Sequence, residues 1–192
     1  MASIKSLGDE ELVVLVRTKD KELYREIVRR YQEKLIRYAV YLLNDKDQAA
    51  DVVQEALIKA FINLQGFNAK KKFSSWIYRI VHNQAVNQIK KRQKEVSLDQ
   101  NNWINQIVGK NNVEEDLEKK EAQKMVRQYL RKLPLIYRSV LTLYYLEEKS
   151  YREISDVLRI PVGTVGVRIN RGKKLMRTIC EKKLPEPEKG GW

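Results

Sequence analysis

Two stretches of the sequence carry many basic side chains and no acidic ones. From Ala56 to Lys94 there are nine lysines and arginines, and from Val157 to Cys180 there are six more. A basic surface attracts a polyanion and releases its condensed counterions, so its affinity for that polyanion falls steeply with salt. Two such surfaces predict two contacts with one long nucleic acid. The alternative is that each is a solvated face that keeps the protein in solution.

Aromatic and amide side chains are interleaved with the first basic stretch. They are Phe67, Asn68, Phe73, Trp76, Tyr78, Asn83 and Asn87. Aromatic faces can stack on unpaired bases and amides can read base edges, a combination that favours melted DNA over intact duplex. For Phe73 and Trp76, a place in the hydrophobic core is favoured over stacking on bases. Asn83 and Asn87 share one helix face, and core packing does not explain them.

Residues that could catalyse a reaction are scarce. The chain has one histidine, His82, one cysteine, Cys180, and no evident cluster of metal ligands. A nucleic-acid-processing enzyme is therefore disfavoured, and neither a metal nor a cofactor is predicted. His82 is interpreted as packing within its helix or facing DNA. A single cysteine excludes an intramolecular disulfide, which fits a cytosolic compartment.

Apolar residues recur at steps of three and four, the period of an amphipathic helix, and form three stripes in the first half of the chain. The stripes comprise Leu23, Ile27, Tyr31, Leu35, Tyr38 and Leu42; Val53, Leu57, Ala60, Phe61 and Leu64; and Phe73, Ile77, Ile80, Val81, Ala85 and Ile89. A shorter acidic helix is predicted before them, at about 10–17, and Asn44-Asp45 breaks the first stripe from the second. Because period-two alternation is scarce, the sequence predicts an all-α fold.

The sequence divides into two small helical domains joined by a flexible linker. The first domain is predicted to span 1–94. Residues 95–116 lose the periodicity and are rich in Asn and Gln, which is typical of a linker, with Trp103 in its one apolar patch. The second domain is predicted at 117–183, and 184–192 form a frayed tail.

The second domain contains a helix–turn–helix pattern. Ser150 and Glu153 form a capping-box pair that opens a short helix ending at Leu158. A turn at 159–161 leads into a longer basic amphipathic helix from Val162 to Cys180. This fits a recognition helix whose N-terminal half reads base edges in the major groove. A helix pair with a short turn also occurs as packing alone.

Composition sets further limits. The 192 residues include 38 Lys and Arg against 25 Asp and Glu, a formal charge of +13, and 43% are hydrophobic. This is the composition of a folded protein with a polyanionic partner, long enough for two helical domains. No apolar run approaches the roughly 18–20 residues that span a bilayer. We therefore expect a cytoplasmic protein with no membrane insertion.

Two runs of the sequence resemble conserved regions of one protein family. The run DVVQEALIKAFINLQGF, continued by FSSWIYRIVHNQAVNQIKKRQ, resembles the second conserved region of extracytoplasmic-function (group IV, sigma-70 family) sigma factors. The run LPLIYRSVLTLYYLEEKSYREISDVLRIPVGTVGVRINRGKKLMR resembles their fourth region. Both occur in the family's order and cover roughly 23–94 and 124–177. The resemblance implies an alternative sigma factor, not an enzyme, that binds core RNA polymerase and directs promoter-specific transcription initiation.

The resemblance also implies roles for named residues. Asp51, Gln54 and Glu55 would bind the polymerase, and they lie on one face of a helix whose other face is apolar. The implied contacts to the −10 element are Phe67, Asn68, Lys70, Lys71, Lys72, Arg79, Asn83, Asn87, Lys90, Lys91 and Arg92. The implied contacts to the −35 element are Thr164, Arg168, Asn170, Arg171 and Lys174.

The recognition helix departs from the family pattern. Gly166 and Val167 stand where a basic or polar pair is usual, and Arg159 replaces a common turn glycine. Gly166 costs roughly 1 kcal/mol of helix stability relative to alanine. It either permits a closer approach of the backbone to DNA or weakens base reading.

The implied partners are bacterial core RNA polymerase, through its β′ clamp and β flap, and promoter DNA, with an anti-sigma factor as a further candidate. The free protein is expected to be a monomer with little stable binding to duplex DNA. The alternative function is a stand-alone helix–turn–helix transcription regulator that dimerises on palindromic sites. That alternative explains the C-terminal half but gives no purpose to the acid–amide face and the aromatic-basic surface of the first domain.

Overall fold

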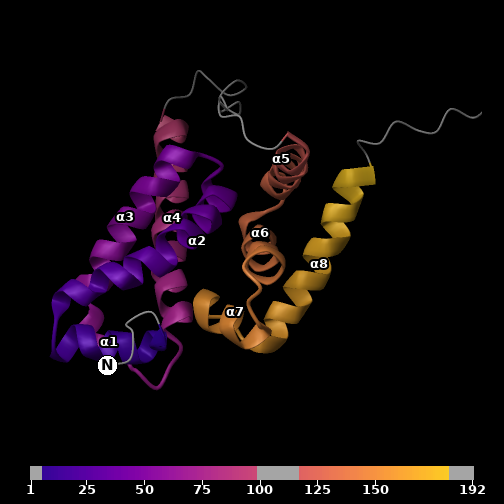
Figure 1. Ribbon diagram of the computed structural model, residues 1–192. Coiled ribbons are helices and arrows are strands. Elements are labelled where there is room, and N and C mark those ends of the chain that lie inside the picture. The colour runs from indigo at the N-terminus through magenta and orange to yellow at the C-terminus, as the bar shows by residue number, and fades with distance from the viewer. Residues whose placement is uncertain (1–5, 99–116, 182–192) are drawn as a thin grey trace, which may run out of the picture.

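The computed structural model describes residues 6–98 and 117–181, and every regular element in these ranges is helical, which confirms the all-α prediction (Figure 1). The α-helices are α1 (Asp9–Thr18), α2 (Tyr24–Leu43), α3 (Lys46–Ile62), α4 (Phe73–Leu98), α5 (Leu117–Arg131), α6 (Leu135–Leu141), α7 (Tyr151–Leu158) and α8 (Val162–Glu181). Short 3-10 turns precede α2 and follow α3, and a π-helical turn, Thr142–Leu146, follows α6.

Helices α1–α4 form an N-terminal bundle and α5–α8 a C-terminal one (Figure 1). Helix α4 continues to Leu98, beyond the domain end predicted at 94. The predicted linker from 99 onward, with Trp103, and the predicted tail lie outside the described residues. Within the described residues, no helix is both long enough and apolar enough to cross a bilayer.

The break between α2 and α3 forms where the sequence predicts it. Asn44 ends α2 in the left-handed conformation, with φ of 57°, which asparagine tolerates better than most residues. The carboxylate of Asp45 then accepts a hydrogen bond from the backbone N–H of Gln48 at 3.1 Å and caps α3. The turn lets the apolar stripes of α2 and α3 meet, and Leu35, Tyr38 and their neighbours are buried.

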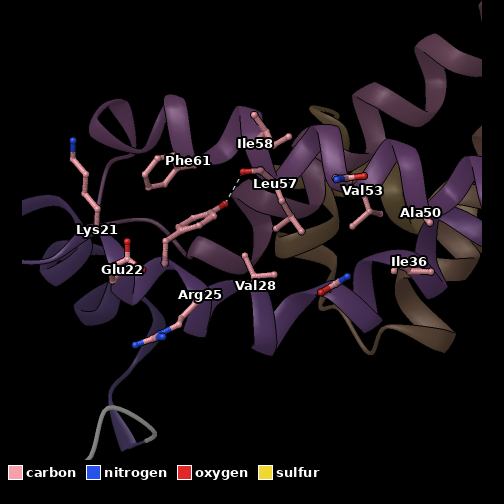
Figure 2. Close-up of a pocket in the computed structure, with 13 residues that line it drawn as sticks. Lys21, Glu22, Arg25, Val28, Ile36, Ala50, Val53, Leu57, Ile58 and Phe61 are labelled. Carbon is pink, nitrogen blue, oxygen red and sulfur yellow. Dashed lines mark hydrogen bonds between the residues drawn. The ribbon is translucent and has the colours of Figure 1, made fainter.

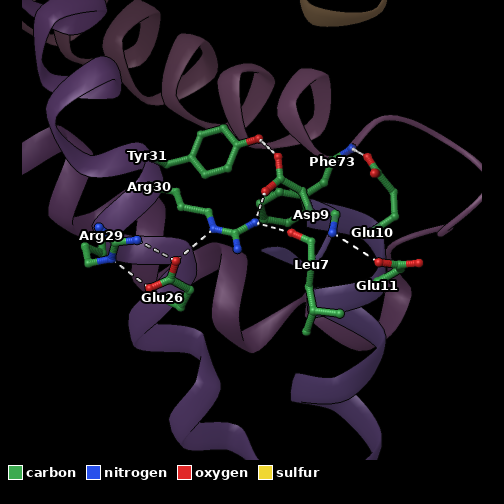
Figure 3. A network of polar contacts seen from close by, with 10 residues as sticks. Leu7, Asp9, Glu10, Glu11, Glu26, Arg29, Arg30, Tyr31 and Phe73 are labelled. Carbon is green, nitrogen blue, oxygen red and sulfur yellow. Dashed lines mark hydrogen bonds and ion pairs between the residues drawn. The ribbon is translucent and has the colours of Figure 1, made fainter. Parts of the chain in front are cut away.

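The short helix α1 connects the start of α4 to α2 through a network of hydrogen bonds (Figure 3). Asp9 accepts hydrogen bonds from Tyr31 and, at 2.8 Å, from Arg30. The neighbouring Glu10 carboxylate accepts the backbone N–H of Phe73 at 2.7 Å. That N–H belongs to the first turn of α4 and has no partner within the helix. The acidic segment predicted at 10–17 therefore satisfies a backbone N–H at the start of α4.

In the C-terminal bundle, α7 and α8 form the predicted helix–turn–helix. The Ser150–Glu153 capping box is confirmed, because each residue's side chain accepts the backbone N–H of the other. Arg159 ends α7 with φ of 55°, the left-handed conformation that explains why glycine is common there. Helix α8 packs closely on α6 at Gly172, where an added Cβ would lie 3.1 Å from Leu141.

Candidate nucleic-acid and protein interfaces

The predicted acid–amide face lies along the exposed side of α3. Asp51, Gln54 and Glu55 are exposed, while Val52, Val53, Ala56 and Leu57 are buried against the bundle. Two large apolar side chains that sequence reasoning did not single out continue the face: Ile58 is 54% and Ile62 69% exposed. Gln54, Ile58 and Ile62 follow one another at steps of four residues, so the sequence alone places them on one side of a helix.

An apolar groove of about 680 Å³ runs beside this face, between α2 and α3 (Figure 2). Its lining residues include Gln54, Ile58, Val28, Ile36 and Phe61. The Tyr24 hydroxyl crosses it and donates a hydrogen bond to the Leu57 carbonyl at 2.7 Å. Phe61 was assigned to the buried stripe, but it is 39% exposed because it packs at the rim, 4.9 Å from the Tyr24 ring.

On its other side, the α3 face meets α4 in a second groove, of about 310 Å³. Asp51 and Glu55 line this groove from α3, and Asn87 and Lys91 line it from α4. Glu55 also accepts a hydrogen bond from Gln84 of α4 at 2.9 Å. The structure therefore brings residues implied in polymerase binding next to residues implied in −10 contacts.

The candidate −10 residues are mostly on the surface. Asn68, Lys70, Lys71, Lys72, Asn83, Asn87, Lys90, Lys91 and Arg92 are exposed, and Arg79 is half-buried. Phe67 differs from the expectation of a ring offered to a base. It is 3% exposed and packs 5.5 Å from the Phe73 ring and 5.2 Å from the Trp76 ring. The cause is the tight turn at 64–66, which folds the loop back onto the start of α4. In this conformation Phe67 belongs to the hydrophobic core, together with Phe73 and Trp76, for which the sequence favours a core position.

His82 packs inside the N-terminal bundle. Its Nδ1 lies 2.9 Å from the hydroxyl of the fully buried Tyr38. Burial lowers the pKa of His82 to about 4, so the ring is neutral at pH 7. Of the two interpretations of His82, packing within its helix is the one observed. Among the described residues, no group of His, Cys, Asp and Glu side chains is placed to hold a metal.

The C-terminal bundle contacts two of the candidate −10 residues. Lys72 forms an ion pair with Glu153 at 3.1 Å, and the Arg79 side chain donates to the Asp156 carbonyl at 2.8 Å. Burial and the nearby Arg159 together lower the pKa of Arg79. Helix α7 therefore pairs with two of the candidate −10 residues, and Figure 1 shows it lying beside α4.

A buried carboxylate joins the two bundles. The side chain of Glu147, which follows the π-helical turn, is 1% exposed and forms a bidentate ion pair with Arg37 of α2 at 2.8 and 2.9 Å. The Tyr78 hydroxyl of α4 donates to the same carboxylate at 2.6 Å. A second contact between the bundles comes from Arg138 of α6, which donates to the Leu42 carbonyl at 2.7 Å. Sequence reasoning missed these residues, since no local pattern indicates which side chains meet across a linker.

The recognition helix α8 presents its basic face to solvent. Asn170, Arg171 and Lys174 are exposed, and Thr164 and Arg168 are partly buried at its sides. The inner face, with Val165, Ile169 and Gly172, packs on the bundle. None of the candidate −35 residues forms an ion pair within the part of the chain that the structure describes. These residues of the basic face of α8 are therefore free of ion pairs within the described residues, whereas two of the candidate −10 residues contact α7.

Comparisons with known proteins identify the family. The sigma-70 region 2 family model matches residues 27–95, and the sigma-70 region 4 model matches residues 123–176. The ECF RNA polymerase sigma factor SigW of Bacillus subtilis is 35% identical, over 84% of this chain and 91% of that protein. The chain belongs to the extracytoplasmic-function sigma factors. Its relatives are transcription initiation factors that work with RNA polymerase on promoter DNA.

Solved structures agree with this fold. The structure of CnrH in complex with the cytosolic domain of CnrY has a TM-score of 0.70 at 19% identity and covers 91% of this chain and 98% of that one. The sigma factor RpoE in complex with the anti-sigma factor NepR from Bartonella quintana has a TM-score of 0.69 at 20% identity, covering 83% and 98%. The predicted family and its fold are both confirmed; the roles of individual residues stay predictions.

Proposed function

We propose that this sigma factor binds its partners through three separate surfaces. The α3 face with its groove binds the core polymerase, the loop before α4 and the exposed side of α4 bind the melted −10 element, and α8 reads the −35 element. The single observation that carries the proposal is the α3 face, where acidic, amide and large apolar side chains are exposed together beside an apolar groove. Such a face on a protein of charge +13 suits a basic, helical protein partner better than DNA.

The polymerase partner would lay helices of its clamp along the α2–α3 groove. Ile58 and Phe61 would supply the apolar contact, and Asp51 and Gln54 the polar rim that fixes register. The β flap would engage the C-terminal bundle. The protein acts in the cytoplasm and catalyses no reaction itself, because its contribution is to place the polymerase and to hold the opened strand.

An anti-sigma factor is a further proposed partner. The sigma factor from B. quintana was solved with one bound. In this chain the α2–α3 groove offers such a partner an apolar site that overlaps the proposed polymerase site. Occupation of the groove would therefore exclude the polymerase by direct competition.

The contacts between the bundles support weak DNA binding by the free protein. Lys72 and Arg79 interact with α7, so two of the proposed phosphate contacts must give up these interactions before they bind DNA. Each lost phosphate contact lowers affinity for DNA and reduces its salt dependence.

Run-off transcription from a promoter library, using bacterial core polymerase with and without the protein, tests the proposal. Transcripts that start downstream of one shared two-element motif are expected only when the protein is present. The double variant Asp51→Ala/Gln54→Ala should lower their yield about tenfold or more. The matched control is Glu33→Ala, which removes an exposed acid of α2 that does not line the groove. Absence of stimulation, together with tight binding of the free protein to a palindromic duplex, would instead establish the stand-alone regulator.

A further inference from the structure

The outward direction of α8 can be defined from its buried residues. Val165, Ile169 and Gly172 are buried against the C-terminal bundle. At the helical step of about 100° per residue, Val167 lies roughly 140–160° around the helix from each of them. Its side chain is 48% exposed. Val167 therefore projects almost directly away from the protein.

The proposed −35 contacts surround this valine. Thr164, Asn170, Arg171 and Lys174 all lie within about 60° of Val167 around the helix axis. Arg168, the remaining proposed contact, lies about 100° away and is partly buried. The centre of the basic face of α8 is thus an apolar, β-branched side chain, with donors and cations on either side.

Gly163, one turn before Val167, leaves room on the same face. A Cβ at Gly163 would meet nothing within 4 Å, and no glycine among the described residues has a positive φ. Neither packing nor backbone conformation of this protein therefore requires glycine at 163, although glycine lowers helix stability. The missing side chain lets the helix come close to a surface lying against Val167.

Val167 fits one feature of the major groove. Base edges there present hydrogen-bond donors and acceptors, and their apolar group is the C5-methyl of thymine. A valine pressed against donor or acceptor edges would deny them water without giving a hydrogen bond. Against a thymine methyl, it instead removes apolar surface on both sides from water.

Resting on the proposed reading of the −35 element by α8, we propose that Val167 determines specificity by packing against a thymine methyl in the major groove. The −35 element then contains an A·T pair under Val167. The flanking Asn170 and Arg171 contact neighbouring base edges, and Lys174 contacts phosphate.

The test removes the methyl group and nothing else. Promoters obtained from the run-off library are rebuilt with deoxyuridine replacing thymidine at one −35 position at a time, on either strand. Holoenzyme made with the wild-type chain, with Val167→Ala or with Val162→Ala is titrated on each template. Val162 is the matched control, because it is 46% exposed on the same helix but lies only about 20–80° from the buried residues.

We expect one deoxyuridine position to raise the half-saturating concentration of wild-type holoenzyme about fourfold, as for loss of one buried methyl contact. The same template should have no effect on Val167→Ala and the full effect on Val162→Ala. Because the thymidine-to-deoxyuridine ratio is taken within each variant, differences in the amount of active protein cancel.

Three results would overturn the inference: equal deoxyuridine sensitivity of wild type and Val167→Ala at every position, loss of that sensitivity in Val162→Ala as well, or a selected −35 element with no A·T pair. These results leave promoter-specific transcription intact. Failure of the proposed function is distinct, because no template would then be transcribed in response to the protein.

Discussion

Replacing Glu147 or its partner Arg37 should separate the two bundles. The Glu147 carboxylate belongs to the C-terminal bundle, whereas Arg37 and Tyr78, which hold it, belong to the N-terminal one. When the bundles part, water hydrates all three groups. The variants therefore act on the equilibrium between closed and open arrangements and leave each bundle's own core intact.

The exposure of the two partners sets the size and the order of the effects. Removing one partner of a fully buried ion pair costs about 3–5 kcal/mol. The Glu147 side chain is 1% exposed but that of Arg37 is 51% exposed, so water already screens part of the interaction. We therefore expect Arg37→Ala to weaken the closed arrangement by about 2 kcal/mol, a shift of about 30-fold in the closed-to-open ratio.

Glu147→Ala should open the protein less than Arg37→Ala does. In Arg37→Ala a buried carboxylate keeps only the Tyr78 hydroxyl, whereas in Glu147→Ala the half-exposed guanidinium regains water. The double variant should resemble Glu147→Ala alone, because nothing is left for Arg37 to pair with. This non-additivity separates a direct pair from two independent contributions.

Small-angle X-ray scattering and hydrogen exchange of the free full-length chain measure the opening. The radius of gyration should rise, and amides of α4 and α7 should lose protection, in the order wild type, Glu147→Ala, Arg37→Ala. Arg177→Ala is the control, since it removes an exposed ion pair of 2.7 Å within α8 whose contribution should be below about 1 kcal/mol. If neither Arg37→Ala nor Glu147→Ala differs from Arg177→Ala, the buried carboxylate does not hold the bundles together.

Three further predictions concern the folding of each bundle. Because burial lowers the pKa of His82 to about 4 from 6.5 in the unfolded chain, the unfolded state binds the proton first. The contribution of His82 to the free energy of unfolding is then largest above pH 6.5 and falls by about 1–2 kcal/mol between pH 7 and pH 5. Urea titrations at a series of pH values should show this fall in the wild type and a smaller one in His82→Phe. An equal fall in both proteins would contradict the assignment. Gly172→Ala should destabilise the protein by about 1–2 kcal/mol, because its Cβ would lie 3.1 Å from Leu141. Gly163→Ala should stabilise it by up to about 1 kcal/mol, because its Cβ would meet nothing within 4 Å. Melting temperatures of the two variants that move in the same direction would refute the packing argument. Arg159→Gly should stabilise the protein by roughly 1 kcal/mol, because glycine adopts the left-handed conformation at φ of 55° without strain. The melting temperature should therefore rise. An unchanged or lower melting temperature would show that contacts of the Arg159 side chain compensate for the strain.

Local patterns predicted the main helices and several of their ends. The Asn44-Asp45 break, the Ser150–Glu153 capping box and the turn that follows α7 all depend on interactions within a few residues. Such features can be predicted from the sequence, because a cap or a turn is formed by residues that are neighbours along the chain. The same holds for the acid–amide face, since helical spacing alone puts Asp51, Gln54 and Glu55 on one side.

Residues whose surroundings come from distant segments were predicted less well. Phe61 fits the apolar stripe of α3, but α2 does not cover it, so it lines an open groove. Phe67 lies in a basic loop that suggests exposure, yet the turn at 64–66 directs its ring onto Phe73. A period indicates which face of a helix is apolar, and it does not indicate how far the neighbouring helix extends.

The exposure of the three proposed surfaces implies an order of events in promoter recognition. The α2–α3 groove and the outer face of α8 are open in the closed arrangement, whereas Lys72 and Arg79 are paired with groups of α7. In the proposed function, polymerase can therefore dock on α3 without separating the bundles, whereas Lys72 and Arg79 must leave α7 before they contact a DNA strand. Since Arg37 lies on α2 and Tyr78 on α4, polymerase binding that favours the open arrangement frees both from Glu147 and uncovers α4 in the same step. On this reasoning, Arg37→Ala removes part of the requirement for polymerase, and the free variant should bind single-stranded −10 DNA more tightly than the free wild-type chain.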